Sequence, residues 1–382
     1  MENIKKLFLG GLFLFILFQC NNTTNEEGLT NTVNVDINKK ETFYLDSIAD
    51  FGGIVPLEVT DESYIKEINQ VYLVDSFIVV WDSPMSNILI FNDKGRYLYN
   101  LGSKGRGPEE YLSFESVYVD YNKRHISLMD NSKLSVITYD IFGNFISEDE
   151  VPYYAYAFYP DKKGYWMLDY GQNPLKDNLI LVDCESKDII QGFMGTNDNL
   201  IVMSSNNFFE DELGNVLFHF PYLNTIYTLE EDGLKPFLRV DFGKLQNPYT
   251  DMKSSNFHDV IKSNNYVGGI HNLYKYEDHL FFSFYKYHGS SNNIDSYNVH
   301  ISLLDNKVSV FDFNLRHTSE LPVSPLPTII GLSDGKLIYQ IDPNILDEAL
   351  IDKLKDSDLM RDAGVSAITA EYNPILVIYD MK

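Results

Sequence analysis

The sequence is poor in cysteine and in basic residues. Its 382 residues contain 2 cysteines, and 30 Lys and Arg residues stand against 55 Asp and Glu, which gives a net charge of −25. A chain this acidic repels phosphate backbones, so a nucleic-acid partner is not expected. Hydrophobic residues make up 44% and charged residues 22%, which argues against global disorder and allows a large core.

Motifs of catalysis are also missing. The sequence has no G-x-S-x-G, no H-E-x-x-H, no P-loop, no C-x-x-C and no G-x-G-x-x-G after a strand. The 8 histidines show no spacing typical of a zinc site. We therefore expect no catalytic residue, no metal and no cofactor. Paired carboxylates stay open as an alternative, because the many acidic residues offer many pairs.

The N-terminus carries a short apolar run. Leu7–Phe18 is apolar apart from Gly10 and Gly11, and it follows Lys5 and Lys6. A helix of this length rises about 18 Å, which is less than the roughly 30 Å of a hydrocarbon core. The pattern therefore predicts a secretory signal peptide over residues 1–19 rather than a membrane span.

The run ends at a cysteine. Leu17-Phe18-Gln19-Cys20 resembles a bacterial lipobox, although Gln19 replaces the usual small residue. We expect a lipid on Cys20, with an incidental cysteine as the alternative. Residues 20–41 are then expected to form a flexible tether, since Asn21–Gly28 is polar and acidic.

These features predict a location and a redox state. Asn21 is not the Asp that favours inner-membrane retention in the best-known sorting systems, so we expect a lipid-anchored outer-membrane protein of the cell envelope. With Cys20 lipidated, Cys184 has no partner for an intramolecular disulfide. No flanking charge activates Cys184, which favours a structural thiol over a nucleophile.

Internal repeats decide the fold class. Phe77–Gly95 (FIVVWDSPMSNILIFNDKG) and His125–Gly143 (HISLMDNSKLSVITYDIFG) share one pattern of strand, polar turn, strand and Gly turn, 48 residues apart. Further copies begin near Tyr165, Asn215, His279 and Lys336. Repeats of this length with four short strands predict a six-bladed all-β propeller of four-stranded antiparallel blades, with short helical insertions on one face.

The ends of the chain are expected to meet. The sixth repeat finds a partner strand at Asn373–Tyr379 and then the chain stops, so it lacks a fourth strand. Thr42–Val59 is β-rich and precedes the first repeat. We expect this segment to supply the missing strand and close one monomeric domain over residues 42–382.

Several segments resemble a known family. IVPLEVTDESYIKEI (54–68), NILIFNDKGRYLYNLGSKGRGPEEY (87–111), NTIY (224–227) and NPILVIYDMK (373–382) look like six-bladed β-propeller lipoproteins of Gram-negative envelopes, distantly similar to NHL and TolB propellers. Gly105–Tyr111 resembles the family's Gly-x-Gly-Pro-Gly-Glu-Phe/Tyr loop, with Glu109 where Gly is usual. The resemblance implies fold and location and almost no reaction chemistry. Some NHL-type propellers are zinc lyases, which is the most concrete enzymatic alternative.

The connections are expected to differ between the two faces of the propeller. Turns between the first and second and between the third and fourth strands of each repeat are short. The long connections, such as 170–178, 241–269, 285–296 and 343–372, all fall on the other face. Apolar spacing predicts helices over Asn344–Lys355 and, less clearly, Thr250–Ser263, which should wall in the mouth of the central channel. Binding is expected on this long-loop face, because ordered loops on a rigid scaffold usually carry it.

Two sets of residues are candidates for this site. Asp82, Asp130, Asp169 and Asp342 end the second strand of their repeats, where they form either an acidic ring or Asx turns, and the turns are favoured. The ligand-binding candidates combine one cation and one carboxylate of the Gly-rich loop with tyrosines of the long connections. They are Arg106, Glu110, Tyr154, Tyr222, Tyr285 and Tyr287.

The sequence thus predicts a non-catalytic envelope lipoprotein. Its long-loop face would bind a glycan, a peptide or a partner protein, and the net charge disfavours polyanions. A hydrolase or lyase with a metal or carboxylate site at the channel mouth is the alternative.

Overall fold

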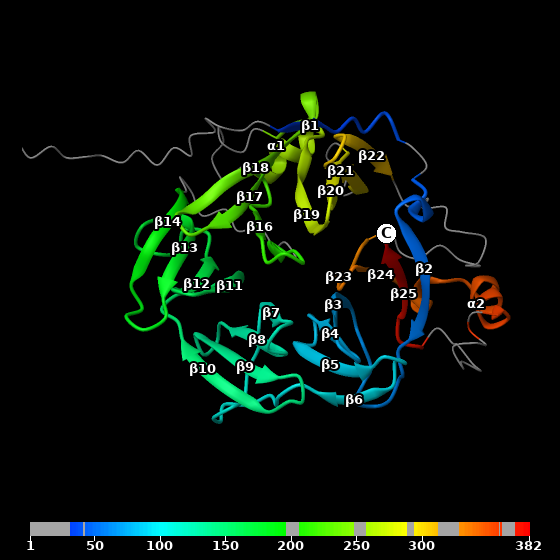
Figure 1. The fold of residues 1–382 in the computed structure, drawn as a ribbon, viewed down its shortest axis with the longest axis horizontal. Helices are drawn as coiled ribbons and strands as arrows, with labels where there is room; N and C mark the ends of the chain where they lie inside the picture. The colour runs from blue at the N-terminus through cyan, green and yellow to red at the C-terminus, as the bar shows by residue number, and fades with distance from the viewer. Residues whose placement is uncertain are drawn as a thin grey trace, which may run out of the picture.

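The structure, a computed structural model, describes residues 31–40, 43–195, 206–247, 257–288, 294–311, 328–358, 360 and 371–382. These residues form six sheets arranged as blades around a central channel, as Figure 1 shows. The sequence prediction of a six-bladed β-propeller is therefore confirmed.

Each blade has four antiparallel strands, which follow one another from the channel to the outer rim. The innermost strands are β3 (Ile68–Val74), β7 (Ser116–Asp120), β11 (Ala157–Asp161), β15 (Phe208–Glu210), β19 (Val267–Tyr276) and β23 (Gly331–Ser333). The second strands are β4 (Phe77–Asp82), β8 (His125–Asp130), β12 (Gly164–Leu168), β16 (Val216–His219), β20 (His279–Tyr287) and β24 (Lys336–Ile341). The third strands are β5 (Asn87–Asn92), β9 (Ser135–Asp140), β13 (Asp177–Asp183), β17 (Thr225–Glu230), β21 (Ile294–Ser302) and β25 (Ile375–Met381). The outermost strands are β6 (Tyr97–Asn100), β10 (Phe145–Glu150), β14 (Ile189–Gly195), β18 (Gly233–Asp241), β22 (Lys307–Phe311) and β2 (Ala49–Pro56).

Residue type follows the position of a strand in its blade. The second and third strands of blade 1, Phe77–Asp82 and Asn87–Asn92, are buried along almost their whole length and are apolar except at Asp82, Asn87 and Asn92. A middle strand is covered by neighbouring blades on both faces, so the residues between its ends are apolar. The outermost strand Tyr97–Asn100 instead alternates between half-buried and exposed side chains, as expected for a strand with one face in water.

The two ends of the chain close the ring. Strand β2 pairs antiparallel with β25, with Ala49 opposite Met381 and Pro56 opposite Ile375. The sixth blade therefore takes its outermost strand from the N-terminal segment, as the sequence predicts for residues 42–59. This closure gives the blade its fourth strand and covers the edge of β25.

A short strand precedes the closing strand. Strand β1 (Thr32–Asn34) pairs in parallel with β18 and becomes a fifth strand of blade 4. Val33, Val35 and Ile37 are each at most 6% exposed and join the core of blades 4 and 5. Residues 31–40 fall within the expected tether, so the folded part begins before residue 42.

The aspartates that end the second strands hold turns rather than form an acidic ring. The Asp130 carboxylate accepts hydrogen bonds from the backbone N–H of Ser132 (2.8 Å) and Lys133 (3.1 Å) in its own turn, and from Leu112 N–H (2.6 Å) in the loop that enters blade 2. Asp82 likewise accepts from Met85 N–H (3.4 Å) in its own turn and from Lys66 N–H (2.8 Å) in the loop that enters blade 1. Asp82 and Asp130 are fully buried, so the favoured Asx-turn interpretation is confirmed for both.

The helices depart from their expected places. Helix α2 spans Glu348–Lys355 and is capped by Asp347, whose side chain accepts a hydrogen bond from Leu350 N–H; the expected start at Asn344 instead falls in the short 3-10 turn η5 (Pro343–Ile345). Helix α1 spans Phe257–Asn264. A further turn of this kind, η1 (Leu45–Ser47), precedes β2, and η2 (Gly243–Leu245) follows β18. Both α-helices lie at the outer rim in Figure 1, so the expectation that they wall in the channel mouth is wrong.

Apolar stripes explain this position. The side chains of Ile351 and Leu354 are buried against the core of blade 6, and Ile261 is buried in the core that includes Tyr222 and Phe220. Each helix is therefore seated by its apolar stripe on the propeller rim.

Three sequence expectations concern other parts of the chain. Cys184 is a free, exposed thiol in the turn between β13 and β14, so it does not pack in the core. The signal peptide and Cys20 lie outside the described residues. Within the described residues, no helix has the length and hydropathy needed to cross a membrane.

Candidate functional site

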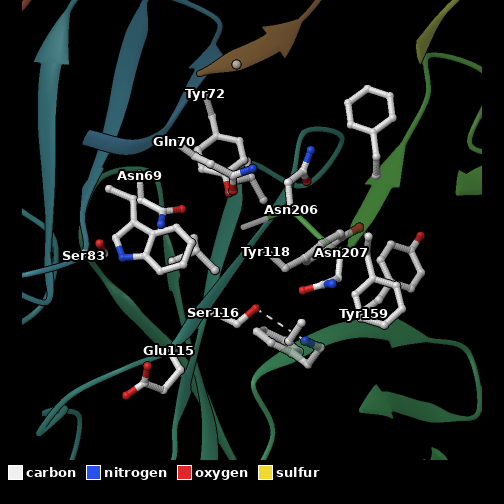
Figure 2. Close-up of a pocket in the computed structure, with 18 of the residues that line it drawn as sticks. Asn69, Gln70, Tyr72, Ser83, Glu115, Ser116, Tyr118, Tyr159, Asn206 and Asn207 are labelled. Atoms are coloured by element: carbon white, nitrogen blue, oxygen red, sulfur yellow. Dashed lines mark hydrogen bonds between the residues drawn. The ribbon is translucent and has the colours of Figure 1, made fainter. Parts of the chain in front are cut away.

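A cavity of about 430 Å³ opens into the channel from the long-loop face. Innermost strands of the blades and the loops that precede them form its walls. Polar and aromatic side chains line it, among them Asn69, Gln70, Tyr72, Trp81, Ser83, Glu115, Ser116, Tyr118, Tyr156, Tyr159, Asn206, Asn207, Glu210 and Tyr274 (Figure 2). The volume falls within the roughly 300–1,000 Å³ of small-molecule sites.

A β-bulge aims one amide of this cavity. The pairing of β3 with β4 shifts register between Ile68 and Gln70, so Asn69 is the extra residue of a bulge. Bulges re-aim a side chain and occur often beside binding sites. In Figure 2 Asn69 and Gln70 extend from one wall and Asn207 from the opposite one, with Ser116 between them.

A buried histidine holds the opposite wall. His219 is fully buried, and its Nε2 lies 3.0 Å from the carbonyl oxygen of Asn206, so Nε2–H donates to that carbonyl. Asn207 Nδ2 donates to the carbonyl of His219 at 3.3 Å. Burial lowers the pKa of His219 to about 4, so the ring is neutral at pH 7 and positions the two asparagines without adding charge.

A carboxylate and two phenols form part of the cavity floor. The Tyr118 and Tyr159 hydroxyls donate to Glu210 Oε2 at 3.1 and 3.0 Å, and the two rings meet edge to face with centroids 5.2 Å apart. Burial raises the pKa of Tyr118 far above its ordinary value, and the neighbouring Tyr159 and Glu210 add to the shift. Burial likewise raises the pKa of Tyr159, so both phenols stay protonated and act as fixed donors, not as bases.

The lining of this cavity carries no basic side chain. Its charged residues are Glu115, at the mouth, and Glu210, at the floor. Glu210 already accepts two hydrogen bonds, whereas no hydrogen bond or ion pair engages the Glu115 carboxylate among the described residues. The site is therefore unfavourable for anions.

Three buried polar atoms of the lining lack a hydrogen-bond partner among the described residues. They are Oδ1 of Asn69, which can only accept, Nε1 of Trp81, which can only donate, and the Tyr274 hydroxyl, which can do both. Trp81 is 6% exposed and faces Phe114, with ring centroids 6.2 Å apart. An unpaired buried polar atom destabilises a fold by about 1–3 kcal/mol, so three at one cavity are groups that a bound molecule could satisfy.

A second, wider cavity lies on the tight-turn face. It measures about 960 Å³ and contains far more carboxylates (Asp75, Asp93, Asp120, Glu210, Asp211, Glu212, Asp334 and Asp380) than lysines (Lys275 and Lys336). Five residues border both cavities and separate them, namely Tyr118, Tyr121, Phe209, Glu210 and Leu332. A face built of short turns thus also carries a cavity, because these turns stand around the open end of the channel.

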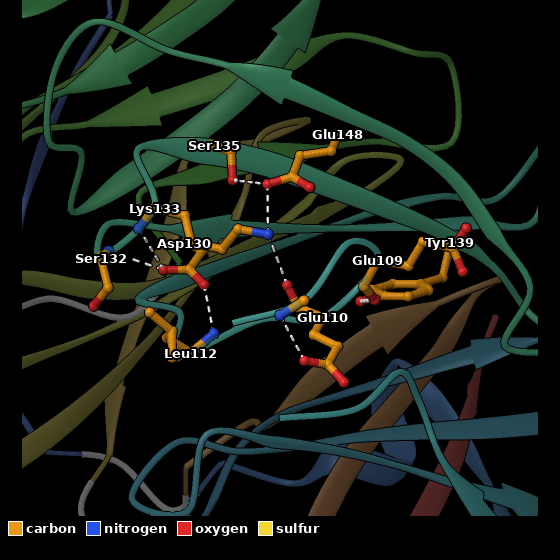
Figure 3. Close-up of polar contacts among 10 residues, drawn as sticks. Glu109, Glu110, Leu112, Asp130, Ser132, Lys133, Ser135, Tyr139 and Glu148 are labelled. Carbon is orange, nitrogen blue, oxygen red and sulfur yellow. Dashed lines mark hydrogen bonds and ion pairs between the residues drawn. The ribbon is translucent and has the colours of Figure 1, made fainter. Parts of the chain in front are cut away.

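The Gly-rich loop is fastened to blade 2 (Figure 3). The Glu110 carboxylate turns back on its own loop and accepts from Gly107 N–H at 2.7 Å, and Lys133 Nζ donates to the Glu110 carbonyl at 2.9 Å. Tyr139 donates to the Glu109 carbonyl at 2.7 Å. Glu110 thus has a structural role in the loop, while Arg106 is exposed beside it.

None of the six sequence candidates lines the channel cavity. Tyr154 comes nearest, because its ring lies 4.8 Å from that of Tyr156, which does line it. Tyr222 is 3% exposed and packs in the core. Tyr285 packs against His271, and Tyr287 lies under Lys262 Nζ at 6.0 Å from the ring centroid. The structure therefore brings these residues to separate places on or below the long-loop face.

Sequence reasoning missed the inner residues although a signal exists. Four innermost strands carry a tyrosine two positions after a small or amide residue, in the triplets Gln70-Val71-Tyr72, Ser116-Val117-Tyr118, Ala157-Phe158-Tyr159 and Asn272-Leu273-Tyr274. Repeats with the same triplet in the first strand predict a tyrosine ring in the channel, since that strand is innermost in every propeller blade.

Some of the described histidines make close contacts with one other titratable side chain. His279 Nδ1 lies 2.9 Å from His300 Nε2, and His288 Nε2 lies 2.6 Å from Asp295 Oδ2. In the part of the chain that the structure describes, no group of three or more His, Cys, Asp or Glu side chains has the arrangement needed to hold a metal ion.

Comparisons with known proteins give a family for the chain and solved structures with a similar fold. A family model described as "Domain of unknown function (DUF4934)" matches residues 30–380. A solved structure of a Bacteroides fragilis NCTC 9343 protein described as exported is 20% identical, covers 92% of this chain and 100% of that chain, and has a TM-score of 0.75. A member of the DUF4221 family from Bacteroides vulgatus ATCC 8482 is 8% identical, covers 87% of this chain and 98% of that chain, and has a TM-score of 0.52. These likenesses concern the fold. The search among curated proteins returned no match.

Proposed function

The chain belongs to the DUF4934 family, and we propose that it is a non-catalytic binding module that takes its ligand into the channel from the long-loop face. The observation that carries this proposal is the channel cavity, whose wall holds three buried polar atoms without partners. The ligand is a glycan, a peptide or an exposed segment of a partner protein. The module acts as a monomer.

A location at the cell envelope fits this role. The apolar run Leu7–Phe18 followed by Cys20 supports export and a lipid anchor in the outer membrane. The Bacteroides fragilis relative is described as exported, which agrees with this direction. A tethered propeller at a membrane would present a rigid mouth to ligands outside it.

Catalysis has less support. The Glu210 carboxylate already accepts hydrogen bonds from two phenols, which hold it in one place as an acceptor. Glu115 is the other carboxylate of the lining, and it stands at the mouth rather than on the floor. A hydrolase or lyase would need a second group poised against a substrate, and the cavity supplies amides and hydroxyls instead.

Tryptophan fluorescence tests where the ligand binds. The chain has 2 tryptophans, and Trp166 is buried in the core while Trp81 borders the cavity. In a Trp166→Phe protein, a ligand in the channel should change Trp81 emission and raise the melting temperature. A Trp81→Phe protein, which keeps Trp166, should show no emission change.

Rim variants separate the channel from the sites expected from sequence. Arg106→Ala and Tyr287→Ala test the rim of the long-loop face, and Arg96→Ala is a charge-matched control in an exposed turn on the opposite face. We expect all three to leave the affinity within about twofold of the parent. Loss of binding in the two rim variants with silent Trp81 emission would overturn the channel site, and binding abolished by Arg96→Ala would overturn the choice of face.

A further inference from the structure

The unpartnered atoms of the cavity define the chemistry of its ligand. Asn69 Oδ1 needs a donor and Trp81 Nε1 needs an acceptor, and both border the same space. A hydroxyl group supplies either role, because it carries one donor and two acceptor sites. We infer that the cavity takes a neutral, hydroxyl-rich ligand, namely the end or a side branch of an uncharged glycan; this inference rests on the proposed function.

Amides and hydroxyls surround those two atoms. Gln70, Asn206, Asn207, Ser83 and Ser116 all line the cavity. Such groups bond to hydroxyls as both donors and acceptors and cannot neutralise a net charge. They also keep a fixed geometry here, because Asn206 and Asn207 are held through His219 and Ser116 Oγ accepts from Phe158 N–H at 3.4 Å. A preorganised set of neutral polar groups favours a polar, uncharged ligand.

The aromatic residues of the cavity wall suit the apolar face of a sugar ring. Trp81, Phe114, Tyr156 and Phe208 line the cavity beside the amides. A pyranose ring has an apolar C–H face and a polar edge, so it needs stacking surfaces next to hydrogen-bonding groups. Aromatic side chains with a polar atom supply both in one residue.

Charge argues against the other ligand classes. The cavity lining holds two carboxylates and no basic group, and the far mouth of the channel is more acidic still. Phosphorylated, sulfated or uronic-acid polymers would be repelled. A basic peptide needs carboxylates that can pair with its positive charges. Glu115 alone is available in the lining, since the Glu210 carboxylate already accepts hydrogen bonds from Tyr118 and Tyr159.

The experiment compares ligand classes on one protein. The Trp166→Phe protein is presented to an array of neutral glycans, acidic glycans and basic peptides, and binders are then titrated by Trp81 emission. We expect neutral glycans alone to bind and to change the emission. If a basic peptide changes Trp81 emission and no glycan does, the ligand class is wrong and the channel site stands. If no compound of any class binds at millimolar concentration, both proposals are wrong.

A matched pair of variants tests the role of Asn69. Asn224 also has a buried, unpartnered Oδ1 but does not border the cavity. Asn69→Leu and Asn224→Leu should therefore leave the melting temperature of the free protein equal or higher, since each removes an unpaired polar atom. Only Asn69→Leu should weaken glycan binding, by tenfold or more. Equal affinities of the two variants would overturn the assignment of Asn69 to the ligand.

Discussion

Phe51 of β2 lies opposite Tyr379 of β25, and the two rings meet edge to face with centroids 5.6 Å apart. These residues are separated by almost the whole chain, and their contact seals the core between blades 5 and 6. Tyr379 is 1% exposed and also contacts Tyr339 of the neighbouring strand, at 5.9 Å between ring centroids. The stability of the ring therefore depends on a segment that precedes the first blade.

Deletion of residues 42–59 should unfold the whole domain rather than trim it. The deletion exposes the edge of β25 and removes Phe43, Leu45 and Ala49 from the core of blade 6. Urea denaturation and size-exclusion chromatography measure the outcome. A soluble monomer with an unchanged midpoint would contradict the closure.

A point substitution tests the same strand more gently. Gly53 has a φ of +132° at the register shift of β2, a conformation that side chains rarely adopt. Gly53→Ala should lower the free energy of unfolding by about 1–3 kcal/mol. Gly195→Ala is the control, because Gly195 has no positive φ and a Cβ there would stand at an ordinary 3.5 Å from Asp177 Oδ1. An equal effect of both substitutions would refute the argument.

Glu109→Gly should stabilise the protein. Glu109 has a φ of +66°, and its side chain is exposed. A non-glycine residue in this left-handed region is disfavoured by about 1–2 kcal/mol, and glycine removes that strain. Part of the gain is offset because glycine loses more chain entropy on folding. We expect a gain of about 0.5–1 kcal/mol in urea denaturation. Glu109→Ala keeps the strain and should show no gain; a gain of the same size there would contradict this explanation.

The fold could be predicted because it repeats. Each copy offers the same alternation of apolar strands and turn residues, and buried aspartates such as Asp130 recur at fixed positions for a local reason, the hydrogen bonds of their own turn. The strand at Thr32–Asn34 escaped prediction because it has no repeat partner and pairs in parallel with a distant strand.

The site could not be predicted from the same patterns. Sequence placed binding at exposed loops, whereas the cavity uses residues of the inner strands, such as Asn69 and Trp81, that converge only when the ring closes. Glu110 looked like a ligand group, yet its carboxylate bonds to Gly107 three residues away. A polar residue next to a glycine turn gives the same sequence pattern whether its side chain binds a ligand or closes the turn.

Cys20→Ser should release the protein from the membrane fraction. The prediction follows from the apolar run and the lipobox-like Leu17–Cys20, since removal of the lipid-bearing thiol leaves no hydrophobic anchor on a processed chain. Cell fractionation with immunoblotting measures it. Cys184→Ser is the control and should stay with the membrane, while unchanged membrane association of Cys20→Ser would count against lipidation.

Acid should destabilise the fold through buried histidines. Burial lowers the pKa of His219 to about 4, and burial with the neighbouring His279 lowers that of His300 to about 3. His271, buried near His219, has a pKa of about 3. The unfolded chain binds these protons near pH 6.5 and the folded protein does not, so the stability present above pH 6.5 is lost as the pH falls towards 4. Asp169 has the opposite sign, because burial raises its pKa to about 6 and the folded form takes up that proton first.

Burial also raises the pKa of Asp82 and Asp177, but less than that of Asp169. The three histidines outweigh these aspartates, and we expect the free energy of unfolding to fall by about 2–4 kcal/mol between pH 7 and pH 5. Urea titrations at the two pH values measure this difference. His300→Phe removes one of the three groups and keeps an aromatic ring against Phe43 and Phe281, whose centroids lie 4.8 and 5.0 Å from the His300 ring. Its stability should therefore depend less on pH than that of the parent. Asp169→Asn removes the strongest of the opposing groups and should steepen the dependence; equal stability of the parent protein at both pH values would show that the histidines titrate normally in the fold.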